Sequence, residues 1–206
     1  MEVVLVAYTP NPEELCAKAM RSCRTAEAMH KFNLDKPAEY YIQLAKKTGH
    51  LSVLEHASFT FSVEGISRAC SHQLVRHRIA SYSQQSQRSV KIDTKGNSGN
   101  WYILPESIRN CGEIAAYEEY DQLMEQIAIF YQRLLKAKVP EEDARFVLPN
   151  ATKTNIVITM NARELLHFFE LRLAKSAQWE IRQMAELMLL EVQKVAPNIF
   201  KEVKTK

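Results

Sequence analysis

The chain has 206 residues, of which 46% are hydrophobic, and a formal net charge of +3 at pH 7. A chain of this length and composition can bury its own core, and we expect one domain over residues 1–206. So mild a charge argues against binding to nucleic acid as a bulk polyanion but leaves a local anionic pocket open. No apolar run is long enough to span a membrane, and the apolar N-terminal stretch has neither the basic leader nor the cleavage site of a signal peptide.

Hydrophobic periodicity and helix-boundary residues divide the chain into alternating elements. In the first half of the chain they predict a strand over 2–8, a helix from Pro12 to about His30, a helix from Pro37 to Gly49, a strand over 57–64 and a helix from Ile66 to about Val75. A mobile polar loop over 91–101 follows. The second half is predicted to contain a long helix from Pro105 to about Ala137, a short helix from Pro140 that carries Arg145, a strand over 154–160, a helix from Asn161 to about Ala174 and a last helix from Ala177 to Val195.

Three patterns in the sequence support these predicted elements and the fold class. Asn11 before Pro12 is typical of a helix start, and Asn161 with Glu164 resembles a capping box. Between 57 and 64 apolar and polar residues alternate, which predicts a half-buried strand. Strands interleaved with helices, with no glycine fingerprint of a dinucleotide fold, favour an α+β domain with a small antiparallel sheet flanked by helices.

The four cysteines form no Cys-x-x-Cys pair. Cys16 and Cys23 would lie two turns apart on one helix, too far for a disulfide. We therefore expect free thiols in a reducing cytoplasm. The histidines and cysteines also lack zinc-binding spacing, so no metal site is expected.

The run from Arg76 to Arg88 contains three arginines, one histidine, three serines and three glutamines. Such a run cannot form a core, but it can line a pocket for a planar, anionic ligand, because arginine offers a rigid fork of donors that matches phosphate. The alternative is that Arg76, His77 and Arg78 complement the negative end of a preceding helix and the rest is a surface loop.

Two further arginines lie on the helix expected from Asn161. Arg163 falls in its first turn, where a cation beside exposed N–H groups makes an anion site, unless Glu164 or solvent absorbs its charge. Arg172 lies on the same face as Asn161. Because apolar residues flank it, we expect this helix to be buried on most sides, so Arg172 needs an anionic partner, either a ligand or Glu170.

The spacing Arg76-His77-Arg78, seven residues, Ser86, one residue, Arg88 resembles the signature of the flavin-dependent thymidylate synthases. The segment from His50 to His56, the Asn161-Ala162-Arg163 block and the stretch 177–182 resemble the same family. The resemblance therefore covers His50 to about Arg182.

This resemblance implies a cytoplasmic methyltransferase of nucleotide biosynthesis that converts dUMP to dTMP. It implies bound FAD, with methylenetetrahydrofolate as carbon donor and NADPH as reductant. Reduced flavin would deliver the hydride, and no cysteine nucleophile would be needed. Family members are typically homotetramers whose active sites are shared between subunits.

The resemblance also implies roles for individual residues. The catalytic pair would be Arg172, which stabilises a uracil ionised at N3, and His50, near the flavin and the folate. The positions that match dUMP-binding residues are Gln73, Arg76, Gln84, Ser86, Gln87, Arg88, Arg145 and Arg172. The positions that match FAD-binding residues are Ser52, Arg76, His77, Arg78, Gln84, Asn161, Arg163 and His167.

Two positions depart from the family pattern. Gln84 stands where many members have glutamate, which leaves hydrogen bonding rather than acid–base chemistry there. Gln87 stands where glycine is common, so its side chain would narrow the nucleotide site or shift the loop.

Two other functions stay open at this point. One is a non-catalytic RNA- or nucleotide-binding module, in which a basic patch surrounds a stacking ring. Its residues would be Arg76, Arg78, Arg88 and Tyr82. The other is a degenerate family member that binds flavin but no longer methylates.

Overall fold

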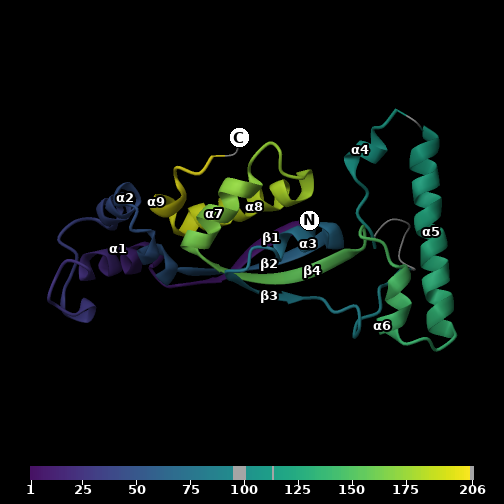
Figure 1. The fold of residues 1–206 in the computed structure, drawn as a ribbon, viewed down its shortest axis with the longest axis horizontal. Helices are drawn as coiled ribbons and strands as arrows, with labels where there is room; N and C mark the ends of the chain where they lie inside the picture. Colours follow the sequence, from purple (N-terminus) through teal and green to yellow (C-terminus); the bar gives the residue numbers. More distant parts are fainter. Residues whose placement is uncertain (95–100, 113, 205–206) are drawn as a thin grey trace. The chain divides into compact units, whose positions relative to one another are not determined.

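The computed structural model describes residues 1–94, 101–112 and 114–204. It contains a four-stranded sheet. Its strands follow the order β1-β2-β4-β3 and are antiparallel (Figure 1). Their bounds are β1 (Glu2–Tyr8), β2 (Ser58–Ser67), β3 (Ala80–Gln84) and β4 (Lys153–Asn161). The expected α+β class with a small antiparallel sheet is confirmed.

The chain forms two compact units. The first comprises Met1–Glu64, Gln73–Ser83 and Ile156–Lys206, and the second comprises Gly65–His72 and Gln84–Asn155. A single domain over residues 1–206 stays a prediction.

The core of the first unit lies on one face of β2. Phe59, Phe61 and Val63 are fully buried while the residues between them are not, as the alternation predicted. Two helices, α7 (Ala162–Arg172) and α8 (Trp179–Val195), lie along one side of β1 and β2 (Figure 1). The ring of Phe200 closes this core, with its centroid 5.7 Å from Phe59 and 5.9 Å from Phe169.

The N-terminal helix is shorter than predicted. α1 (Pro12–Ser22) begins after Asn11 as expected, but the Asn11 side chain makes no capping hydrogen bond. The expected end near His30 is wrong, because the chain turns back after Ser22 and forms only the short 3-10 helix Met29–Lys31. Arg21 stabilises this change of direction, because its side chain donates a hydrogen bond to the Asn33 carbonyl at 2.7 Å. A tertiary contact thus overrides the helix propensity of this segment.

The next elements agree with the sequence. α2 (Ala38–Thr48) starts after Pro37 and ends at Gly49, whose φ of 74° is the left-handed conformation that glycine adopts readily. The 3-10 helix η2 (Leu51–His56) leads into β2.

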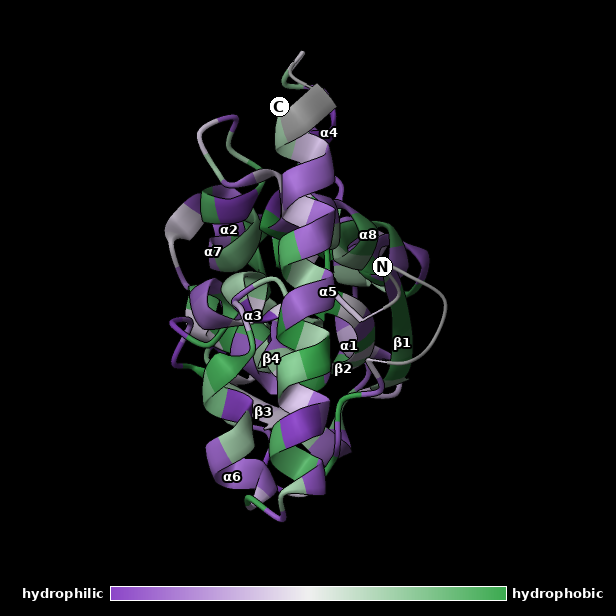
Figure 2. Ribbon diagram, turned by 90° about the vertical axis from the view of Figure 1, so that its right-hand side faces the viewer, coloured by the Kyte–Doolittle hydropathy of each residue, from purple (hydrophilic) through white to green (hydrophobic). Residues whose placement is uncertain are grey.

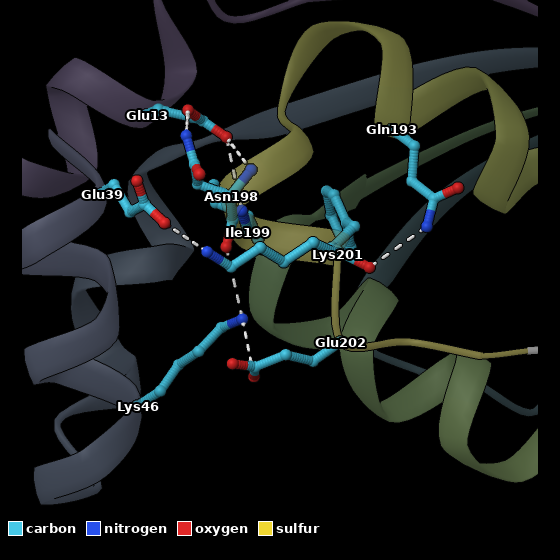
Figure 3. Close-up of polar contacts among 9 residues, drawn as sticks. Glu13, Glu39, Lys46, Gln193, Asn198, Ile199, Lys201 and Glu202 are labelled. Atoms are coloured by element: carbon cyan, nitrogen blue, oxygen red, sulfur yellow. Dashed lines mark hydrogen bonds and ion pairs between the residues drawn. The ribbon is translucent and has the colours of Figure 1, made fainter.

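The end of the chain is fastened to its beginning (Figure 3). Pro197, expected only to stop a helix, opens the short helix α9 (Pro197–Phe200). Half-buried Glu13 of α1 accepts hydrogen bonds from the Asn198 side chain at 2.7 Å and from the Ile199 N–H at 3.3 Å. Lys46 of α2 adds an ion pair to Glu202 at 3.1 Å.

Replacing Glu13 with glutamine is expected to destabilise the protein by about 1–3 kcal/mol, because an amide loses the charge that strengthens these hydrogen bonds. Urea denaturation of the variant measures the effect. Glu14→Gln is the matched control, since Glu14 is exposed and its ion pair is with Lys18, one turn away on the same helix. Equal midpoints for the two variants would contradict this account of the fastening.

The second unit is built around the long helix α5 (Ile114–Lys136), along which apolar and polar bands alternate (Figure 2). Its core contains Ile92, Trp101, Tyr102, Met124, Ala128, Tyr131 and Ala144. The shorter helices are α3 (Arg68–Leu74), α4 (Glu106–Arg109) and α6 (Glu141–Ala144), followed by the 3-10 helix η3 (Arg145–Val147). The short helix predicted from Pro140 is confirmed, but Arg145 lies just after α6, as the first residue of η3.

Two predicted boundaries in this unit are wrong, both at glycines. Gly65 was expected to end a strand, but its N–H donates to the Asn155 side chain at 3.2 Å and β2 continues to Ser67. One helix was expected from Pro105 to Ala137, but Gly112, with φ of 77°, separates α4 from α5. The mobile loop predicted over 91–101 falls mostly on 95–100, which lie outside the described residues.

The four cysteines form no disulfide with one another, with Cys16 and Cys70 buried and Cys23 and Cys111 exposed. Burial raises the pKa of the Cys16 thiol to about 12. Among the described residues, no group of side chains could hold a metal ion. In the same part of the chain, no helix has the length and hydropathy needed to cross a bilayer.

Candidate functional site

A pocket of about 500 Å³ lies in the first unit, between η2 and α7. It brings together three of the predicted flavin-binding side chains with apolar and acidic neighbours. Its lining comprises Leu51, Glu55, Ile79, Asn161, Arg163, Glu164, Leu166, His167 and Glu170.

The amphipathic helix α7 builds one wall of this pocket. Its buried face carries Leu165, Phe168 and Phe169, while Arg163 and His167 are exposed one turn apart. The expectation that this helix is buried on most sides is therefore wrong. Asn161 caps the helix as predicted, with its side-chain oxygen accepting from the Glu164 N–H at 2.9 Å.

Arg163 pairs with Glu55 of η2. The sequence predicted that, without an anionic ligand, Glu164 or solvent would balance the charge of Arg163. In the structure Glu55, which is far away in sequence, balances this charge instead. Both side chains are about half exposed, so the pair contributes little to stability and a ligand can displace it.

Beneath the pocket, His77 links a carboxylate to an arginine. Its Nδ1 lies 3.3 Å from the Glu164 carboxylate, and its Nε2 accepts from the Arg172 Nε at 3.0 Å. Because a guanidinium only donates, Nε2 must present a lone pair and the ring proton must sit on Nδ1, facing Glu164. His77 and Glu164 are both buried, and Arg172 is half buried.

Burial and the nearby Arg172 charge lower the pKa of His77, while its bond to Glu164 acts in the opposite direction. The ring is therefore neutral near pH 7, in agreement with its hydrogen bonds. The Phe168 ring packs edge-on against it, with centroids 5.0 Å apart. The Tyr82 hydroxyl donates to the His77 carbonyl at 2.7 Å and anchors the backbone of the motif.

The predicted partner of Arg172 needs correction. Glu170 was the alternative to a ligand, but the structure pairs Arg172 with His77, and its Nη2 lies 3.5 Å from the Gln73 carbonyl oxygen. Glu170 lies instead 3.9 Å from His167.

The other candidates in this unit lie at its surface. His50 immediately precedes η2, and Ser52 lies within it, next to the pocket residue Leu51. Arg76 and Arg78 are exposed just after α3 ends, so their side chains are accessible to a ligand.

The remaining candidates belong to the second unit, where two arginines converge on one residue. Arg88 Nε lies 2.9 Å from the Glu142 carboxylate, and Arg145 Nε donates to the Glu142 carbonyl at 3.0 Å. Nearby, burial and the Arg145 charge both lower the pKa of Arg68. Sequence reasoning missed Arg68 and Glu142. A cation in the first turn of α3 was the available signal for Arg68.

The polar run after the Arg-His-Arg motif contains a strand that the sequence did not predict, β3. Its last residue, Gln84, donates from Nε2 to the Ser71 hydroxyl at 2.9 Å and to the Thr154 hydroxyl at 3.3 Å. Ser86 and Gln87 follow the strand, and the Ser86 hydroxyl accepts from the Arg88 N–H at 3.2 Å.

A family model described as "Thymidylate synthase complementing protein" matches residues 4–198. The chain is 47% identical to a protein of Geobacter sulfurreducens named flavin-dependent thymidylate synthase, over 98% of this chain and 86% of that one. It is 44% identical to a Pyrococcus furiosus protein of the same name, over 94% and 80% of the two chains.

Two solved structures share the fold. The UMP/dUMP methylase PolB of Streptomyces cacaoi, solved with 5-Br dUMP, is 26% identical, with a TM-score of 0.84 over 97% of this chain and 93% of that one. Thymidylate Synthase X of Helicobacter pylori, solved with FAD and dUMP, is 22% identical, with a TM-score of 0.78 over 98% and 99% of the two chains.

Proposed function

This chain belongs to the flavin-dependent thymidylate synthase family, and we propose that it converts dUMP to dTMP with bound FAD, methylenetetrahydrofolate as carbon donor and NADPH as reductant. The match to the family over residues 4–198 carries this proposal. The pocket that gathers Asn161, Arg163 and His167 supports it from the structure.

The pocket in the first unit fits a flavin chemically. Leu51, Ile79 and Leu166 offer an apolar surface to a planar ring, and Arg163 places a cation near the first turn of α7. When bound, FAD supplies the hydride chemistry of the reaction. The residues proposed to hold it are Ser52, Arg76, His77, Arg78, Gln84, Asn161, Arg163 and His167.

For the substrate, two kinds of chemistry are proposed. In the first unit, Arg172 is proposed to stabilise a uracil ionised at N3, which makes the ring the nucleophile toward the folate methylene. In the second unit, Arg88 and Arg145 are proposed to bind phosphate through charge-assisted forks. The other residues proposed to bind dUMP are Gln73, Arg76, Gln84, Ser86 and Gln87.

His50 is proposed to act beside the flavin and the folate. Its place at the start of η2, one residue before the pocket residue Leu51, supports this role. No cysteine nucleophile is proposed, and burial keeps the Cys16 thiol protonated at neutral pH.

We further propose a cytoplasmic homotetramer with active sites shared between subunits. Cysteines that form no disulfide are usual in a reducing compartment. Large apolar side chains at the surface, among them Val6 of β1 and Phe146, are favourable to self-association.

One relative points to a second substrate, because PolB of Streptomyces cacaoi is a UMP/dUMP methylase. The thymidylate synthases are closer in sequence, at 44–47% identity against 26%, and favour dUMP. Assaying dUMP and UMP side by side decides between the two substrates.

The proposed function is tested by the visible spectrum of the purified protein and by its turnover. We expect a yellow protein that oxidises NADPH and forms dTMP when dUMP and the folate are present. A colourless protein that cannot take up FAD would overturn the proposal. A yellow protein without turnover would identify a degenerate member, and RNA binding that falls steeply with salt would favour the nucleic-acid module.

A further inference from the structure

We propose that Glu164 and His77 are positioning residues, which orient Arg172 so that one edge of its guanidinium is presented to the uracil base. This inference rests on the proposed function, because it assumes that Arg172 meets a pyrimidine. It assigns Glu164 a role in the reaction, and it gives His77 one that requires no contact with the flavin.

The hydrogen bonds of Arg172 select the edge that is presented. In a guanidinium, Nε and Nη2 share one edge, while Nη1 and Nη2 form the other. His77 and the Gln73 carbonyl accept from Nε and Nη2, so both hold the first edge. The Nη1–Nη2 edge then remains to donate two parallel hydrogen bonds to a ligand.

That edge suits one form of the base. A uracil deprotonated at N3 presents adjacent acceptors, N3 and a carbonyl oxygen, which two parallel N–H groups can match. A neutral uracil presents an N3–H donor there, which a guanidinium cannot accept. A guanidinium fixed in this orientation therefore favours the ionised base, whereas a freely rotating one spends part of its time in other orientations.

Glu164 is needed because a neutral imidazole has two tautomers. With the carboxylate at Nδ1, the proton stays on Nδ1 and Nε2 can accept from Arg172. With the proton on Nε2, two donors would face each other and Arg172 would lose its support. Besides Glu164 and Arg172, the charged or titratable groups near His77 include its sequence neighbours Arg76 and Arg78, His167, with ring centroids 6.2 Å apart, and Tyr82, which donates to its carbonyl.

Glu164 is itself held in place. Its backbone N–H is capped by Asn161, and its side chain is 9% exposed. The chain of contacts thus runs from the capped first turn of α7 through His77 to Arg172 in the last turn of the same helix.

Glu164→Gln tests the proposal. The glutamine amide can donate to Nδ1 as well as accept from it, so it no longer holds the ring proton on Nδ1. The tautomer with the proton on Nε2 breaks the bond to Arg172. Affinity is measured for dUMP and for deoxyribose 5-phosphate, which lacks the base. We expect the variant to bind dUMP about 10- to 100-fold more weakly while its affinity for deoxyribose 5-phosphate is unchanged. Glu191→Gln, at an ion pair on α8, is the control expected to match wild type.

Three results separate the possible failures. If wild type binds dUMP no better than deoxyribose 5-phosphate, the proposed function is overturned. If Arg172→Ala loses the contribution of the base but a folded Glu164→Gln retains it, the positioning role alone is overturned. The ¹⁵N NMR shifts of the His77 ring in wild type need no variant, and a proton on Nε2 would also overturn it.

Discussion

Replacing Arg172 with alanine is expected to lower the kcat for dTMP formation by at least about 100-fold, while the protein keeps its flavin colour. The reason is that Arg172 is proposed to favour the ionised base, the form that reacts, so its loss raises the barrier as well as weakening the binding of dUMP. Flavin should remain because the pocket of Asn161, Arg163 and His167 does not include Arg172. Single-turnover formation of dTMP measures the rate of the reaction, and a visible spectrum of the same sample measures the bound flavin.

Arg172→Lys separates charge from geometry. Lysine keeps the positive charge but lacks the fork that meets His77, Gln73 and a ligand together. We expect it to stay close to the alanine variant in kcat. Full activity in either variant would show that Arg172 does not act on the reacting base.

The second large effect is expected on substrate binding. Arg88→Ala should raise the KM for dUMP by about 10- to 100-fold, the range expected for losing hydrogen bonds to a charged group. The kcat should change little, because phosphate contacts are the same in the ground and transition states.

Lys91→Ala is the matched control for Arg88→Ala. Lys91 lies three residues further on and pairs with Glu141 at 3.3 Å, much as Arg88 pairs with Glu142 at 2.9 Å. Both variants lose one exposed positive charge, so a general loss of electrostatic attraction would raise the KM of both alike. Only a specific phosphate contact raises the KM for dUMP much more in Arg88→Ala than in Lys91→Ala. Equal KM values for the two variants would contradict that contact.

Local rules predicted much of the fold. β1 has the predicted bounds, Gly49 ends α2, and Asn161 caps α7, because each depends on residues adjacent in sequence. The errors arose where distant contacts decide. Arg21 turns the chain after Ser22, Asn155 extends β2 past Gly65, and Glu13 holds α9 beyond the point where Pro197 was expected to end all helix.

The site shows the same division. Sequence alone marked Arg163 and Arg172 as cations in need of partners, but Glu55 and His77 belong to segments far from them. The polar run after the Arg-His-Arg motif hid β3, because its serines and glutamines are typical of a loop. Its strand character comes from pairing with β4, which no local pattern encodes.

The closing of the core by Phe200 has a consequence for synthesis on the ribosome. Phe59 leaves the ribosome long before Phe169 and Phe200, the residues whose rings complete its surroundings. The apolar face of β2 therefore stays unprotected until these later segments have been made, a state in which nascent chains are prone to aggregate. Synthesis of the segment that contains Phe169 and Phe200, rather than emergence of residues 1–64, permits the first unit to fold.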